Sequence, residues 1–178
     1  SVPYMFDDEK QFTDYLNSET GKKLMNSVDG LEIKTLGTWT RSFRQITNSK
    51  HPVNAPEDLS GIVLRVPNNP LWVEYFSKAG ASCTPMSFSE VYNALQLGTL
   101  DGQENPNTLI FDAGFYEAQK YLTISRHFYT PYVLMISRKT WDKLSPEDQK
   151  LIQKCADEAK VFQRETNRRL DAEYLQKI

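Results

Sequence analysis

Hydrophobic and polar positions along the chain follow two periods, one typical of helices and one typical of strands. Apolar side chains recur three or four positions apart over residues 8–28, where Gly21 is a candidate break between two helices, and over residues 145–176. Alternation of apolar and polar side chains predicts a strand over residues 31–39. Short apolar runs predict two more strands, over residues 62–66 and 132–137.

Further helices are predicted between these strands. Residues 70–79 begin with Pro70, which is favoured at the first position of a helix, and Gly80 follows their end. Helical patterns also cover residues 87–97 and 108–119. Strands that alternate with helices indicate an α/β fold whose sheet is at least partly parallel.

Two segments are candidates for connections between lobes. Residues 40–60 are polar and contain Pro52 and Pro56, so they predict a connector rather than a long regular element. A second link lies near residues 124–132. If both segments cross between lobes, residues 42–130 form one lobe. Residues 1–41 and 131–178 then form the other.

The composition narrows the classes of function. Hydrophobic residues make up 39% of the 178 residues and charged residues 25%, which is typical of a globular protein. The net charge of −2 argues against a nucleic-acid partner. The apolar runs are too short for a membrane span, and no signal-peptide pattern is recognisable. No CxxC or HExxH spacing occurs, so we predict no metal site, no cofactor, and free thiols at Cys83 and Cys155.

Arg65 lies inside the apolar run "GIVLRVPN". The predicted strand ends just after it, and open α/β sheets bind ligands outside the carboxyl ends of their strands. Its planar guanidinium fits a carboxylate through two parallel hydrogen bonds. The alternative is a salt bridge inside the protein, with Glu90 or Glu104 as the partner. The pattern alone leaves both interpretations open.

Other candidate residues surround this strand in the sequence. The turn "DGQENP" concentrates Asp101, Gln103, Glu104 and Asn105, which are either turn formers or groups that bind a hydroxylated or carboxylated ligand. Arg44 lies on the predicted connector. Phe88 begins a predicted helix, either in the core or facing a cleft.

Charged residues elsewhere, His127 among them, are expected on solvated surfaces. No Ser/His/Asp triad, nucleophile elbow, phosphate loop or dinucleotide fingerprint is present, so the sequence does not predict an enzyme.

Several longer motifs occur in a consistent order along the chain: "LRVPN", "TPMSFSEVYNALQLGTLDGQENP", "FYEAQKYLT" and "KLSPEDQKLI". Together they resemble the solute-binding proteins of TRAP (tripartite ATP-independent periplasmic) transporters. The resemblance implies a periplasmic protein with a two-lobe, periplasmic-binding-protein-like α/β fold. It also implies capture of an organic acid, such as a C4-dicarboxylate or a sugar acid, for a sodium-coupled membrane permease.

The resemblance also implies roles for individual residues. Arg65 matches the arginine that holds the ligand carboxylate, and Asn105 matches an asparagine that assists it. Arg44 matches an arginine that contacts ligand in some members. Asn68 and Phe88 match positions that line the cleft in binders of acidic sugars.

The family pattern extends beyond both ends of this chain, so we expect a fragment in which one lobe is incomplete. An exposed strand edge in that lobe would favour a homodimer. Two alternatives to transport are a periplasmic sensor-type binding protein for a carboxylate and an enzyme that uses Glu104 or Asp101 as a base.

Overall fold

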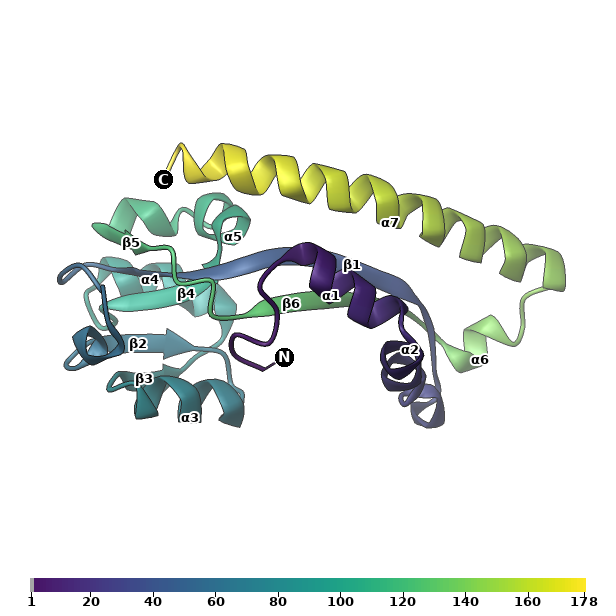
Figure 1. Cartoon of the computed structure of the whole chain (residues 1–178), viewed down its shortest axis with the longest axis horizontal. Coiled ribbons are helices and arrows are strands. Elements are labelled where there is room, and N and C mark those ends of the chain that lie inside the picture. Colours follow the sequence, from purple (N-terminus) through teal and green to yellow (C-terminus); the bar gives the residue numbers. More distant parts are fainter. Residues whose placement is uncertain (1) are drawn as a thin grey trace. The chain divides into compact units, whose positions relative to one another are not determined.

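The computed structural model describes residues 2–178 (Figure 1). The chain divides into two compact units. Unit 1 comprises Ser1–Ser42 and Phe128–Leu170, and unit 2 comprises Phe43–His127 and Asp171–Ile178. Strand β1 and helix α7 each contribute residues to both units.

Helices and strands alternate along much of the chain, as the pattern predicts. The α-helices are α1 (Glu9–Asn17), α2 (Glu19–Asn26), α3 (Pro70–Lys78), α4 (Val91–Gln96), α5 (Asn107–Asp112), α6 (Arg138–Trp141) and α7 (Pro146–Leu175). The strands are β1 (Ile33–Asn48), β2 (Val63–Val66), β3 (Ser82–Pro85), β4 (Gly102–Pro106), β5 (Tyr121–Thr123) and β6 (Tyr129–Ser137). Short 3₁₀ turns occupy Asp29–Leu31, Pro56–Leu59, Phe88–Glu90 and Phe115–Ala118. None of the helices in the described range has the length and apolar character needed to cross a bilayer.

The first helical segment breaks at Ser18 rather than at Gly21. The Ser18 side chain accepts a hydrogen bond from the Gly21 amide at 3.1 Å and so caps α2 directly after α1 ends. Gly21 has a different role, because a Cβ there would lie 2.1 Å from the Tyr15 carbonyl oxygen. The glycine therefore permits close packing of the two helices instead of separating them.

In unit 1, β6 pairs with β1, and α7 packs against this pair. Leu36 on β1, Trp141 and Ala156 form its buried cluster. Side-chain amides of α7 also bind the strand backbone: Gln163 accepts from the Thr40 amide at 3.0 Å and donates to the Thr40 carbonyl at 2.8 Å. These bonds satisfy backbone groups of β1 that would otherwise lie half-buried without partners.

In unit 2, the strands lie in the order β3-β2-β4-β1-β5. Strand β2 runs parallel to β3 and β4, whereas β1 runs antiparallel to β4 and β5. The sheet is therefore mixed, in agreement with the predicted α/β class. Its apolar core includes a cluster from α4, α5 and the segments that follow them: Val91, Ala94, Leu95, Leu100, Ile110 and Phe115.

Two segments differ from the pattern-based prediction. Residues 40–48 were expected in a connector, but β1 continues through them to Asn48. The polar side chains of residues 44–48 are buried where β1 pairs with β4, so polarity there reflects pairing and not solvent. The helix expected over residues 108–119 is shorter: α5 ends at Asp112, and a 3₁₀ turn then leads into β5.

Candidate functional site

The candidate site is built around β4, whose five residues are all buried. Register places Gln103 opposite both Arg65 of β2 and Thr47 of β1. Side chains alternate between faces along a strand, so Asn105 shares the face of Gln103 and Arg65, and Glu104 points to the other face. The buried "QEN" segment thus presents polar groups on both sides of the sheet.

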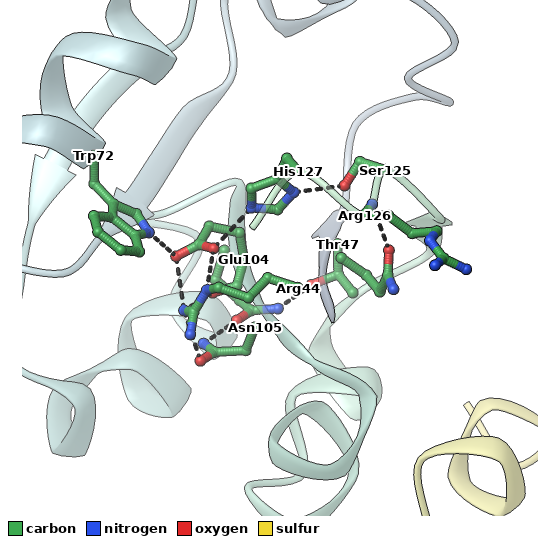
Figure 2. Close-up of polar contacts among 10 residues, drawn as sticks. Arg44, Thr47, Trp72, Glu104, Asn105, Ser125, Arg126 and His127 are labelled. Atoms are coloured by element: carbon green, nitrogen blue, oxygen red, sulfur yellow. Dashed lines mark hydrogen bonds and ion pairs between the residues drawn. The ribbon is translucent and has the colours of Figure 1, made fainter. Parts of the chain in front are cut away.

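Glu104 accepts hydrogen bonds at both carboxylate oxygens (Figure 2). Arg44 donates to it from Nε at 2.5 Å and from Nη2 at 2.8 Å. The Trp72 indole donates to Oε1 at 3.1 Å, and His127 Nε2 lies 2.9 Å from Oε2. Each oxygen therefore has two partners, which matches the acceptor capacity of an ionised carboxylate.

The surroundings of Glu104 keep it ionised. Burial alone would raise its pKa, but the charge of Arg44 and the hydrogen bonds from His127 and Arg44 outweigh burial and lower the pKa from 4.5 to about 2. Glu104 is thus a fixed negative charge that neutralises Arg44.

Arg44 also connects Glu104 with Asn105. Its Nη2 donates to the Glu104 carbonyl at 2.7 Å and to Asn105 Oδ1 at 2.9 Å. The Asn105 amide in turn donates to Gln103 Oε1 at 2.6 Å, and Gln103 donates to Thr47 Oγ1 at 2.8 Å. This chain of bonds fixes the orientation of the Asn105 side chain. Two of the predicted site residues, Arg44 and Asn105, are therefore in direct contact.

His127 was expected on a solvated surface, but that prediction was wrong, because only 1% of the residue is exposed. Its Nδ1 lies 2.7 Å from Ser125 Oγ, while Nε2 faces Glu104. A proton on Nε2 lets His127 donate to Glu104, and both ring nitrogens thus have a polar partner.

Two residues of this network, His127 and Trp72, were not among the candidate residues. Glu104 was a candidate only as part of the "DGQENP" turn and as a base. For His127, the adjoining aromatic residues of "RHFY" were a signal that the segment enters the core.

Arg65 lies at the carboxyl end of β2 and is 4% exposed. Its Nε and Nη2 donate to the Met86 carbonyl oxygen at 3.0 and 2.6 Å. No carboxylate within residues 2–178 lies at ion-pair distance from it, so the alternative interpretation, a salt bridge with Glu90 or Glu104, does not hold. Burial lowers the pKa of Arg65, Glu104 raises it and Arg44 lowers it. Arg65 is a buried cation whose charge lacks a contacting counterion.

The other two predicted site residues, Asn68 and Phe88, lie outside the hydrogen-bond network around Glu104. Asn68 is exposed in the loop between β2 and α3. Phe88 is 42% exposed at the start of the turn before α4, and its ring centroid lies 5.5 Å from that of Phe115. Neither makes a hydrogen bond to Glu104 or its partners.

Among the described residues, no group of three or more His, Cys, Asp or Glu side chains is arranged to hold a metal ion. Cys83 and Cys155 form no disulfide.

Comparison with known proteins places this chain in a family. The family model described as "Bacterial extracellular solute-binding protein, family 7" matches residues 1–178. The 2,3-diketo-L-gulonate-binding periplasmic protein YiaO of Escherichia coli (strain K12) is 38% identical over 177 residues, which is 99% of this chain and 53% of that protein. The C4-dicarboxylate-binding protein DctB of Bacillus subtilis (strain 168) is 31% identical over 177 residues, covering 99% and 51% of the two chains.

Solved structures agree with this result. The sugar acid binding protein DctPAm from Advenella mimigardefordensis strain DPN7T, crystallised with galactonate, superposes with a TM-score of 0.94 at 39% identity, covering 98% of this chain and 56% of that one. The chain therefore spans about half the length of the relatives it matches. Across that span it belongs to the family 7 extracellular solute-binding proteins, the TRAP-transporter type that its motifs predict.

Proposed function

We propose that the protein captures an organic acid through Arg65 and delivers it to the permease of a TRAP transporter. The observation that carries this proposal is the buried guanidinium of Arg65, which has no contacting carboxylate in the described chain. A buried charge is stable only when paired, and a bidentate carboxylate is the partner that a guanidinium fits best. The ligand carboxylate supplies the charge that the protein does not.

Arg44 has a different role from Arg65 in this proposal. Glu104 already neutralises Arg44, so Arg44 adds no net positive charge for a ligand. Its hydrogen bond to Asn105 instead orients that amide, which lies on the same face of the sheet as Arg65. We assign Arg65 as the carboxylate anchor, Asn105 as an assisting hydrogen-bond group, and Arg44 as the residue that positions Asn105.

The charges in unit 2 favour a sugar acid with one carboxylate over a C4-dicarboxylate. Arg65 is the site cation without a contacting counterion, and it matches a single carboxylate charge. YiaO and DctPAm, whose names specify a diketogulonate and a sugar acid, are 38% and 39% identical to this chain, against 31% for DctB. Exposed Asn68 and the half-exposed ring of Phe88 then offer contacts to hydroxyl groups and to the apolar face of a sugar.

We further propose how the two units correspond to the lobes of a binding protein. Unit 2 corresponds to one lobe of a two-lobe binding protein and unit 1 to part of the other. The intact protein works in the periplasm.

A homodimer of this chain is also proposed. Strand β6 pairs only with β1 among the described strands, which leaves one strand edge open for a second copy. Sedimentation velocity tests the homodimer of this chain, and a concentration-independent monomer overturns it.

The geometry around Glu104 argues against the enzyme alternative. A general base needs a free lone pair and a pKa near the working pH. Both oxygens of Glu104 are occupied, and its pKa is about 2. Asp101 accepts from the Val63 amide at 2.9 Å and pairs with Lys50 at 3.2 Å, which gives it a structural role.

Titration calorimetry tests the proposed ligand and its anchor. The protein is titrated with a six-carbon aldonate, a hexuronate and succinate, as wild type, as Arg65→Lys, and as the control Arg169→Lys on an exposed part of α7. We expect the aldonate or hexuronate to bind more tightly than succinate. Arg65→Lys should weaken binding by about tenfold or more, because an ammonium cannot form the two parallel bonds.

The control variant should bind as the wild type does. Unchanged affinity in Arg65→Lys overturns the carboxylate anchor, and tighter binding of succinate overturns the sugar-acid assignment.

A further inference from the structure

Unit 1 contains a cavity of about 230 Å³ that is separate from the Arg65 site and is lined by side chains of α1 and α7. The lining residues are Glu9, Lys10, Thr13, Arg164 and Arg168. Three of the five are cations, one is an anion and one is a neutral hydroxyl. Because cationic side chains outnumber anionic ones here, a small cavity of this composition attracts negative charge.

Ion pairs within the described chain neutralise two of the three cations. Lys10 lies 2.6 Å from Asp14, and Arg168 Nε lies 3.2 Å from Glu9. Arg164 has no such partner, and its Nε is a buried donor without a hydrogen-bond acceptor among residues 2–178. An unsatisfied buried donor is unfavourable, and it is more so when it carries charge.

The spacing of Arg164 and Arg168 adds to the excess of positive charge in the cavity. Arg164 and Arg168 stand four residues apart on α7, where side chains are neighbours on one helix face and like charges repel. Two adjacent guanidinium groups can donate together to the oxygens of one anion. The Thr13 hydroxyl provides a further, uncharged donor in the same cavity.

We propose that this cavity between α1 and α7 is a binding site for a small oxyanion, a carboxylate or phosphate held by Arg164 and Arg168. Arg164 supplies the charge and the free donor, and Arg168 exchanges part of its contact with Glu9 for the anion. Glu9 weakens the site because its own carboxylate competes for Arg168.

Titration with inorganic phosphate and, separately, with acetate tests the site in the 178-residue chain. Binding is followed by the ¹⁵N–¹H signals of arginine Nε groups and by calorimetry. We expect saturable binding that shifts the Arg164 Nε signal. Arg164→Gln should weaken binding by about tenfold or more, and Glu9→Gln should strengthen it about two- to fivefold.

Two control variants separate this site from other effects. Lys154→Gln removes one positive charge from an exposed position more than two helical turns away on α7 and should leave binding unchanged. Arg65→Lys should leave the titration of the Arg164 Nε signal unchanged, so failure of the proposed transport ligand and failure of this site are distinguishable. The stronger of the two anions identifies the occupant. Absence of saturable binding, or equal binding by the Arg164→Gln variant with intact circular dichroism, overturns the proposal.

Discussion

Arg44 and Glu104 lie 60 residues apart in the sequence and form a buried pair joined by two side-chain hydrogen bonds. The antiparallel register of β1 and β4 explains the contact. Arg44 stands opposite Pro106 and Ile46 opposite Glu104, so Arg44 and Glu104 are diagonal neighbours on one face of the sheet. The pair leaves Arg65 as the cation of this site without a contacting counterion, which is the basis for its proposed role.

The first prediction concerns stability at low pH. The pKa of Glu104 falls from 4.5 to about 2 on folding, so ionised Glu104 stabilises the fold above the unfolded-state pKa. This contribution, about 3 kcal/mol, should be lost as the pH falls from about 5 towards 2. Urea unfolding as a function of pH measures it. In Glu104→Gln, the loss of unfolding free energy between pH 5 and pH 2 should be smaller by about 3 kcal/mol. A pH profile equal to that of the wild type would contradict the lowered pKa of Glu104.

A second prediction concerns the coupling between Arg44 and Glu104. Arg44→Met leaves a buried carboxylate without its main counterion, and we expect it to lower the free energy of unfolding by about 3–5 kcal/mol. Adding Glu104→Gln removes that uncompensated charge, so the double variant should be more stable than Arg44→Met alone. A double-mutant cycle from urea unfolding gives the interaction energy. Additive effects of the two substitutions would show that the pair is not coupled.

A third prediction separates binding from stability at Arg65. Burial lowers the pKa of this residue, so its charge is disfavoured in the unliganded fold. Arg65→Met should abolish measurable acid binding while changing the free energy of unfolding by no more than about 1 kcal/mol, since it removes an unpaired buried charge along with the bonds to Met86. Calorimetry and urea unfolding on the same samples check both halves. A large loss of stability would mean that Arg65 is mainly structural.

The fourth prediction concerns the close approach of β4 to β1. A Cβ at Gly102 would lie 2.4 Å from the Thr47 carbonyl oxygen and 3.0 Å from Asn48 Cβ. Gly102→Ala should therefore destabilise the protein by about 1–3 kcal/mol or more and disturb the adjacent Gln103–Asn105 segment. Gly37→Ala, in the same strand as Thr47, is the matched control, because a Cβ there meets nothing within 4 Å. Equal effects of the two substitutions would contradict this account.

The sequence alone determined the class of fold and the family. Periodicity placed most helices and strands, because a helix or strand that buries one face must repeat its apolar residues at the matching interval. The strand-end position of Arg65, together with the family resemblance at Asn105 and Arg44, pointed to three residues that the tertiary structure places on adjacent strands of one sheet.

Only the tertiary structure decided which charges cancel. Polarity predicted that residues 40–48 form a connector and that His127 is solvated. Residues 44–48 and His127 are instead buried, because their polar groups pair with groups far away in the chain. Local patterns report whether a residue tends to face water, but they do not report which distant residue it meets. Strand register brought Glu104 to Arg44 rather than to Arg65, and this pairing distinguishes the neutralised arginine from the one left to bind a ligand.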